Sequence, residues 1–175
     1  MSLAIGAAAP AFTLPDTDGS PTALHDGASA ATVVVFTCNH CPYALAWHER
    51  LQGVARDYRA RGVRTLQINA NDAARHPSDS PAAMAARVSG GEFAGPYLRD
   101  DTQEVARAWG AAVTPDVYVL DGEGRLAYHG APDADYCEES LAAGWLRDAL
   151  DDVLAQRPVG RAETKPVGCS IKWRR

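Results

Sequence analysis

The pattern of hydrophobic positions predicts a strand followed by a helix in the first third of the chain. Residues 32–37 form a nearly continuous run, Thr-Val-Val-Val-Phe-Thr, which is typical of a strand buried on both faces. From Pro42 to about Gly62, hydrophobic residues recur three and four positions apart, and this spacing predicts an amphipathic helix. A second buried strand is expected at 63–68, parallel to the first because crossover connections are right-handed.

Further patterns extend this core toward both ends of the chain. Two short hydrophobic segments, 11–14 and 21–24, flank a run of turn-forming residues and predict an N-terminal β-hairpin. After the second strand we expect short helices at 82–88 and 102–109, strands at 116–120 and 125–129, and an amphipathic helix at 138–155. This order predicts an α/β fold, with a central mixed β-sheet flanked by helices on both faces.

The length of 175 residues is that of one domain, which we place at residues 1–157. Residues 158–175 contain several prolines and glycines and are expected to form a C-terminal tail without a regular element. The tail carries Ile171 and Trp173, which are costly to leave in water, so we expect it to dock on the domain with Trp173 as its anchor.

Composition and charge exclude several classes of protein. Lys and Arg number 17 and Asp and Glu number 22, giving a net charge of −5, whereas a nucleic-acid-binding protein needs a positive surface. No hydrophobic run approaches the roughly 20 residues of a membrane span, and the first residues lack the basic segment of a signal peptide. We therefore expect a cytoplasmic protein with no nucleic-acid or membrane partner.

Two of the four cysteines, Cys38 and Cys41, lie between the first buried strand and its helix. The unpaired N–H groups and the dipole of a helix N-terminus stabilise a thiolate and lower its pKa. Three residues is one helical turn, which allows the two sulfurs to join. His40 lies between them and is expected to stabilise the thiolate further, which makes the disulfide more oxidising. Half of a zinc site, or two buried thiols, is the alternative interpretation of this motif.

Four segments of the chain resemble the redoxin branch of the thioredoxin-like superfamily. They are 5–16, Val-Val-Val-Phe-Thr-Cys-Asn-His-Cys-Pro-Tyr at 33–43, Val-Thr-Pro-Asp-Val-Tyr-Val-Leu-Asp at 113–121 and Gly-Cys-Ser-Ile-Lys-Trp at 168–173. The sequence is most similar to peroxiredoxin-like proteins of the alkyl hydroperoxide reductase/thiol-specific antioxidant group that retain a C-x-x-C motif. The resemblance implies a thioredoxin-like fold, with Cys38 as the attacking thiol and Cys41 as the resolving thiol.

The resemblance also implies roles for residues near the two cysteines. Thr114-Pro115 stands where thioredoxin-like proteins carry a cis-proline facing the dithiol, so Pro115 is expected at the active site. Thr114 and Asn39 are expected to bind substrate. Cys169, in the tail, is a candidate third thiol that exchanges with the pair, and its alternative role is packing.

The sequence departs from the superfamily pattern at two places. Thioredoxins keep a buried acid on the strand before the motif, and residues 32–37 contain no carboxylate. Peroxiredoxins carry Pro and Thr seven and three residues before the reactive cysteine. Counting from Cys38 gives Ala31 and Val35, and counting from Cys41 gives Val34 and Cys38, so neither position fits.

These observations predict a thiol–disulfide oxidoreductase that forms a mixed disulfide at Cys38 and resolves it with Cys41. We expect Cys38 to be the more acidic and more exposed of the two. No metal or organic cofactor is expected, and the partners are protein or small-molecule disulfides and thiols, with a thioredoxin reductase-like electron donor. Two alternatives remain: a thiol peroxidase whose Cys38 sulfenic acid is resolved by Cys41 or Cys169, and a redox-inert or metal-binding interaction module.

Overall fold

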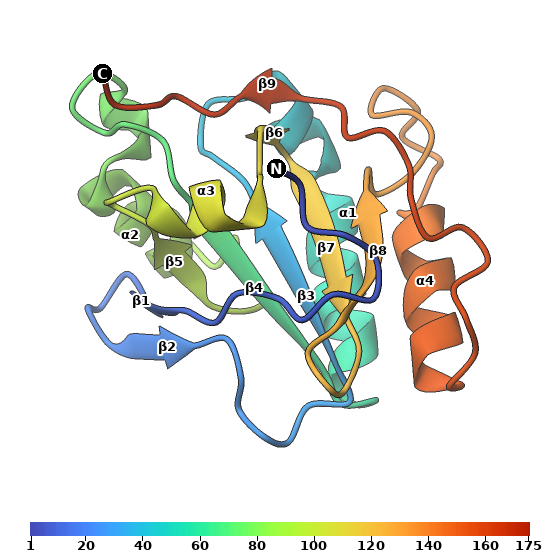
Figure 1. The fold of residues 1–175 in the computed structure, drawn as a ribbon. Helices are drawn as coiled ribbons and strands as arrows, with labels where there is room; N and C mark the ends of the chain where they lie inside the picture. Colours follow the sequence, from blue (N-terminus) through green and yellow to red (C-terminus); the bar gives the residue numbers. More distant parts are fainter.

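The computed structural model describes residues 1–175 as an α/β fold around a five-stranded sheet (Figure 1). The strands lie in the order β5–β4–β3–β7–β8. Their bounds are Ala31–Phe36 (β3), Val63–Asn69 (β4), Tyr97–Arg99 (β5), Asp116–Leu120 (β7) and Leu126–Gly130 (β8). β4 is parallel to β3 and β5, while β7 is antiparallel to β3 and β8, so the prediction of a mixed sheet is confirmed.

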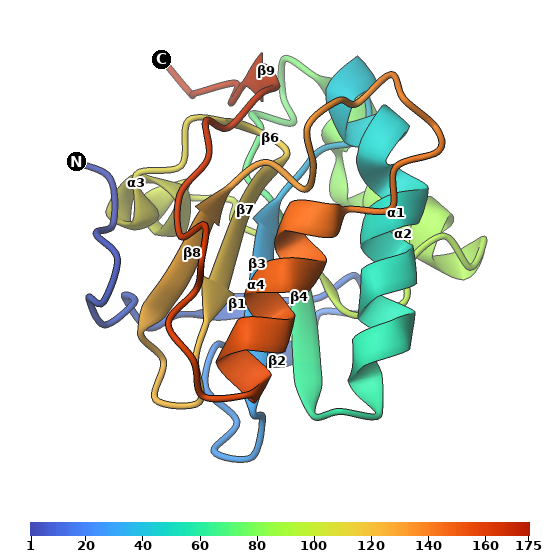
Figure 2. The same ribbon diagram turned by 90° about the vertical axis from the view of Figure 1, so that its right-hand side faces the viewer.

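Helices cover both faces of the sheet. On one face, α1 (Pro42–Arg59) and α4 (Gly144–Leu154) lie side by side (Figure 2). The opposite face carries α3 (Glu104–Trp109) and the N-terminal segment, while η1 (Pro77–Asp79) and α2 (Pro81–Ser89) lie at the β5 edge (Figure 1). None of these helices has the length and hydrophobicity needed to cross a lipid bilayer.

The buried strand β3 divides the core into two clusters. Its side chains alternate, so that Val33 and Val35 pack with Trp47 of α1 on one face, while Val34 and Phe36 belong to the cluster on the other. This two-sided burial explains why β3 is almost wholly hydrophobic, as expected for a central strand between helices.

The N-terminal hairpin is formed by β1 (Thr13–Pro15) and β2 (Pro21–Ala23), close to the predicted segments. The last helix is shorter than predicted, since α4 begins at Gly144 rather than at residue 138. The preceding residues instead form a loop fastened by the buried Asp133, which accepts hydrogen bonds from Trp47 (2.8 Å), Arg50 (3.0 Å) and the Ala143 N–H (3.0 Å).

The C-terminal segment runs along the domain and forms a strand that the hydrophobic pattern did not predict. β9 (Cys169–Ser170) pairs antiparallel with β6 (Val113–Thr114) at the end of the sheet that carries the cysteines (Figure 1). Ile171 is buried in the core, and its N–H donates to the Ala112 carbonyl at 3.0 Å. Trp173 is only partly buried and stacks under Arg107 at 4.5 Å, so Ile171 is the deeper anchor of the two.

Candidate active site

The two cysteines lie where β3 ends and α1 begins. Cys41 is the N-cap residue of α1, and Pro42 occupies the first turn, where a backbone N–H has no helical partner. Cys38 lies in the loop between Phe36 and the helix. Both cysteines are buried, with 2% of Cys38 and 0% of Cys41 exposed. Cys38 is therefore enclosed almost as fully as Cys41, and the expected difference in exposure between the two thiols is very small.

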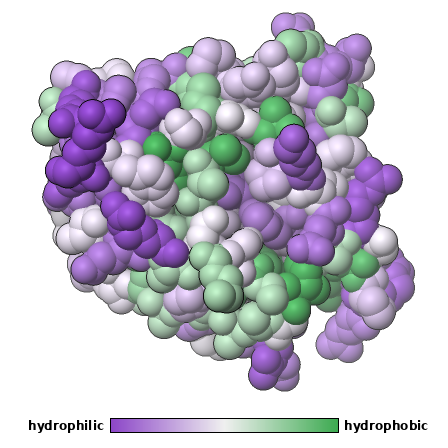
Figure 3. All heavy atoms as spheres, turned by 45° about the horizontal axis from the view of Figure 1, so that its top comes forward, coloured by the Kyte–Doolittle hydropathy of each residue, from purple (hydrophilic) through white to green (hydrophobic).

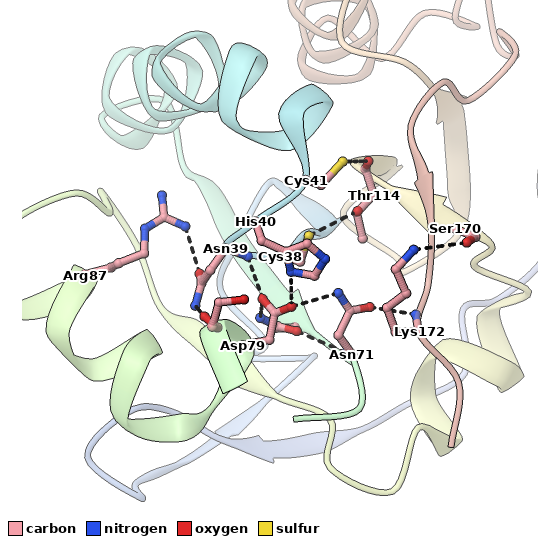
Figure 4. Close-up of polar contacts among 12 residues, drawn as sticks. Cys38, Asn39, His40, Cys41, Asn71, Asp79, Arg87, Thr114, Ser170 and Lys172 are labelled. Carbon is pink, nitrogen blue, oxygen red and sulfur yellow. Dashed lines mark hydrogen bonds and ion pairs between the residues drawn. The ribbon is translucent and has the colours of Figure 1, made fainter. Parts of the chain in front are cut away.

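Thr114 joins the two sulfurs from the opposite side of the site (Figure 4). The Cys41 thiol donates to the Thr114 carbonyl at 3.1 Å, and the Cys38 sulfur lies 3.4 Å from the Thr114 hydroxyl. The Thr114–Pro115 peptide bond is cis, and it connects β6 to β7, the neighbour of β3. Thr114 and Pro115 thus lie at the dithiol, and the Thr114 carbonyl is engaged by Cys41.

The two thiols ionise as a coupled pair. The hydrogen bond between them lowers the pKa of Cys41 to about 4 and, together with burial, raises the pKa of Cys38, which is the reverse of the expected order of acidity. Local contacts favour the opposite placement of the charge, because the Thr114 carbonyl repels a thiolate at Cys41, whereas a thiolate at Cys38 accepts from the Thr114 hydroxyl. The pair as a whole therefore loses its first proton at low pH, and the two sulfurs share the proton that remains.

His40 and the buried Asp79 lie beside Cys38 (Figure 4). The His40 Nδ1 atom is 2.5 Å from an Asp79 carboxylate oxygen, without the alignment of a hydrogen bond. The Cys38 sulfur, a ring nitrogen of His40 and a carboxylate oxygen of Asp79 all lie within 4.8 Å of one another. The His40 ring stacks on that of His76, with ring centroids 5.4 Å apart. A thiol, an imidazole and a carboxylate therefore meet at one point.

Asp79 is held as an anion by neighbouring donors. It comes from η1 and is completely buried, yet it accepts from the Asn39 N–H (2.7 Å) and from the side chains of Asn69 (2.9 Å) and Asn71 (3.0 Å). Burial alone would raise the pKa of Asp79, but these hydrogen bonds and His40 outweigh it, so the pKa is lowered. A buried carboxylate thus lies beside Cys38, although the strand before the motif has none.

Sequence reasoning missed Asp79, although a signal was present. The polar residue Asn69 ends β4, Asn71 and Asp79 follow it, and β4 is parallel to β3. Residues after the carboxyl ends of neighbouring parallel strands meet at one edge of the sheet. The segment after β4 was therefore the place to look for groups that reach Cys38.

Asn39, which we predicted to bind substrate, has its side chain engaged inside the protein. The carbonyl oxygen accepts from Arg87 (2.8 Å) and from the Tyr97 hydroxyl (2.7 Å), and the amide donates to the Ser78 carbonyl (2.8 Å). With its N–H on Asp79, Asn39 fixes the loop between the cysteines. The polar atoms of the Asn39 side chain are thus engaged by groups of the protein itself.

The two remaining cysteines differ in their surroundings. Cys169 is half-buried and packs against the cluster formed by Cys38, Cys41 and Ala44. Cys137 is exposed and lies outside that cluster. The structure therefore brings a third thiol to the pair and leaves the fourth apart.

The surface around this end of the molecule is mixed in character. Figure 3 shows hydrophobic residues reaching the surface between hydrophilic ones on the face that contains the top of Figure 1. Leu45, in the first turns of α1, is one of the few large hydrophobic residues that are exposed.

Comparisons with known proteins agree with this geometry. The AhpC/TSA family model matches residues 5–129, which is more than half of the chain. A crystal structure of an uncharacterized conserved protein from Geobacillus kaustophilus is 39% identical, with a TM-score of 0.93, and the match covers 98% of this chain and 93% of that chain. No curated protein matches the sequence.

More distant structures share the fold. A putative thiol:disulfide interchange protein DsbE from Chlorobium tepidum is 18% identical with a TM-score of 0.71, over 87% of this chain and 99% of that chain. Peroxidoxin BcpB from Mycobacterium tuberculosis is 17% identical with a TM-score of 0.61, over 87% of this chain and 95% of that chain. The protein therefore belongs to the AhpC/TSA family and has a thioredoxin-like redoxin fold.

Proposed function

We propose that the protein is a thiol–disulfide oxidoreductase whose reactive pair is Cys38 and Cys41. The observation that carries the proposal is the placement of both sulfurs on Thr114, at the N-terminus of α1 and next to the cis-proline Pro115. A single low-pKa ionisation of the pair provides a thiolate at neutral pH, and the thiolate is the form that attacks disulfides.

The first step is attack of the Cys38 thiolate on one sulfur of a substrate disulfide. The substrate S–S bond breaks, a Cys38–substrate disulfide forms, and the departing sulfur takes a proton. Cys41 then gives up its proton and attacks the Cys38 sulfur, which releases the second substrate thiol and leaves a Cys38–Cys41 disulfide. Two electrons have passed from the protein to the substrate, and two external thiols restore the dithiol as they are oxidised to a disulfide.

His40 and Asp79 support the reaction at Cys38. Asp79 fixes the His40 ring beside the Cys38 sulfur, where a ring N–H would stabilise a thiolate or return a proton to it. Because only 2% of Cys38 is exposed, a bulky disulfide reaches it only when the surrounding loop opens. We propose protein and small-molecule disulfides as substrates, with a thiol-based electron donor such as a thioredoxin reductase-like protein.

Reduction of insulin disulfides by a chemical thiol tests this proposal. The wild-type protein should accelerate the reaction, and Cys38→Ser and Cys41→Ser should each abolish the acceleration, whereas Cys137→Ser should leave it intact because Cys137 lies outside the cluster. An acceleration that survives in Cys38→Ser would overturn the assignment.

Thiol peroxidase activity is the second candidate, favoured by membership of the AhpC/TSA family. In that case Cys38 is oxidised by a peroxide to a sulfenic acid, which then condenses with another thiol and releases water. The same variants assayed for peroxide consumption distinguish the two activities. A catalysed loss of hydrogen peroxide without insulin reduction would favour the peroxidase.

Metal binding is the third candidate, because Cys38, His40 and Asp79 offer a sulfur, a nitrogen and an oxygen within 4.8 Å of one another. Such a mixed set suits a transition metal such as zinc. However, Asp79 already accepts hydrogen bonds from Asn39, Asn69 and Asn71, which a metal ion would have to replace in part. Metal analysis of protein purified under reducing conditions checks this alternative, and a stoichiometric ion that blocks alkylation of Cys38 would support it.

A further inference from the structure

Cys169 is held at the active site by the pairing of β9 with β6, which restricts the position of its backbone. In the β6–β9 ladder, Thr114 lies opposite Cys169, and Thr114 is the residue that contacts both active-site sulfurs. Cys169 packs against the cluster formed by Cys38, Cys41 and Ala44, and its thiol contributes to the lowered pKa of Cys41. A cysteine contacting Cys41 is thus fixed by backbone pairing to the edge of the active site.

The tail is fastened on the far side of Cys169 as well. The Ile171 N–H donates to the Ala112 carbonyl (3.0 Å), and the Lys172 N–H donates to the Asn71 side chain (2.9 Å). The Lys172 carbonyl accepts from the Asp72 N–H (2.8 Å) and from Gln103 (2.9 Å). The folded tail therefore already holds Cys169 close to Cys41, so the entropy of bringing the two groups together is not lost during the reaction. This arrangement favours reaction between the two sulfurs.

Gly168 allows this close approach. A Cβ atom placed on Gly168 would lie 2.6 Å from the Thr114 carbonyl carbon and would also collide with the carbonyl oxygen, both of which are backbone atoms. Only glycine fits between the tail and the residue that holds the dithiol. A glycine is therefore required at position 168 for Cys169 to lie next to the active site.

We propose that Cys169 is a third redox-active thiol, which receives the disulfide from the buried pair by forming a Cys41–Cys169 bond. This inference rests on the proposed exchange at Cys38 and Cys41. The Cys169 thiolate attacks the Cys41 sulfur of the Cys38–Cys41 disulfide. The Cys41–Cys169 bond forms, the Cys38–Cys41 bond breaks, and Cys38 leaves as a thiolate that takes up the proton lost by Cys169. One disulfide replaces another, so no external oxidant or reductant is needed.

The transfer moves the disulfide to a place that a reductant can reach. Cys38 and Cys41 are buried, whereas Cys169 is half-buried. An external thiolate can therefore attack the Cys169 sulfur and free Cys41, and a second thiol then releases Cys169. In the reduced protein, burial, followed by the neighbouring Cys41, raises the pKa of Cys169 to about 11. Burial remains when Cys41 is part of the disulfide, so the transfer should accelerate as the pH rises.

The first experiment isolates the predicted bond in a Cys38→Ser, Cys137→Ser protein, which keeps only Cys41 and Cys169. In glutathione redox buffers this protein should form an intramolecular disulfide, and mass spectrometry should assign it to Cys41 and Cys169. Adding Gly168→Ala should lower the equilibrium constant for this disulfide at least tenfold. Gly160→Ala, in the same tail but with only an ordinary 3.8 Å contact at its Cβ, should change it less than twofold.

Mixed disulfides with glutathione in place of the intramolecular bond would overturn the inference, as would an equilibrium constant insensitive to Gly168→Ala in a protein that remains folded. If Gly168→Ala does not fold, the second measurement decides.

The oxidised wild-type protein and oxidised Cys169→Ser are reduced by a bulky thiol, and Cys169→Ser should react several-fold more slowly. Equal rates would contradict the relay, and insulin reduction lost only in Cys38→Ser and Cys41→Ser would still leave the proposed function in place.

Discussion

At the scale of single residues, the shared proton of Cys38 and Cys41 is the property that matters most for reactivity. The hydrogen bond between the thiols lowers the pKa of Cys41 to about 4, whereas a free cysteine ionises at about 8.5. We therefore predict about one thiolate per pair at neutral pH, lost as the pH falls through about 4. A lowered pKa contributes stability that is fully present above the ordinary value and disappears toward the folded value. The reduced protein should thus lose stability as the pH falls from about 9 to about 4.

Ultraviolet thiolate absorbance of the reduced protein across this pH range provides the measurement. The double variant Cys38→Ser, Cys41→Ser is the control, and the difference between the two proteins gives the thiolate of the pair. A difference that appears only near pH 8.5 or above would contradict the shared-proton description.

His40 is expected to tune the reduction potential of the pair. Its ring is held by Asp79 beside the Cys38 sulfur, so His40→Ala removes a group that stabilises the thiolate more than the disulfide. We predict a less oxidising disulfide, by tens of millivolts, since about 30 mV corresponds to about 1.4 kcal/mol for two electrons. Redox titration against glutathione checks this. His76→Ala is the matched control, because His76 stacks on His40 but is not one of the groups around Cys38. Equal shifts in both variants would assign the effect to ring stacking.

The sequence located the cysteines and Thr114-Pro115 but not the acid beside them. Cys38 and Cys41 are adjacent in a motif, and Thr114-Pro115 lies in a segment that resembles the superfamily. Asp79 has no such marker, since the donors that hold it come from Asn39, Asn69 and Asn71 and converge only in the folded chain. From the sequence alone, a carboxylate such as Asp79 in a polar loop is expected to be exposed to solvent. Its position beside Cys38 follows only once the order of the strands is known.

At the scale of elements, the long periodic segments and the hairpin marked by turn residues were predictable, whereas β5 and β9 were not. β3, β4 and α1 have enough hydrophobic repeats to define their type from the sequence alone. β5 and β9 have three and two residues, too few for a period, and they exist because β4 and β6 offer them backbone partners. The start of α4 was misplaced because the loop before it is set by Asp133 rather than by helix-forming residues.

Asp133 is expected to be a strong stabilising contact between α1 and the loop before α4. Asp133→Ala would leave the Trp47 N–H without its acceptor and the buried Arg50 guanidinium without a carboxylate partner, with only backbone carbonyls of the loop to accept from it. We predict a loss of about 3 kcal/mol in the free energy of unfolding, as for other broken buried ion pairs. Urea denaturation measures it. Asp148→Ala, an exposed position on α4, should change stability by less than about 0.5 kcal/mol. Similar values for the two variants would show that Asp133 contributes little.

At the scale of the whole molecule, the C-terminal tail connects the active site to the core. Ile171 is 3% exposed and packs in the cluster on the α3 face of the sheet, directly after β9. Ile171→Ala should cost about 2 kcal/mol or more through the lost burial and the cavity. It should also accelerate amide hydrogen exchange at residues 169–172, because their partners on β6 and Asn71 are engaged only while the tail is docked. Val167→Ala, at a position 37% exposed, is the control. Unchanged exchange in Ile171→Ala would mean that the tail is held without this anchor.

The assignment of Cys38 as the attacking thiol is tested most directly by trapping its mixed disulfide. In a Cys137→Ser background, Cys41→Ser removes the resolving thiol, so that a disulfide attacked by Cys38 remains bound. After brief reaction with oxidised glutathione, peptide mass spectrometry should find the adduct on Cys38, and the wild-type pair should instead show a Cys38–Cys41 disulfide without a lasting adduct. An adduct confined to Cys169, with Cys38 still a free thiol, would contradict the account.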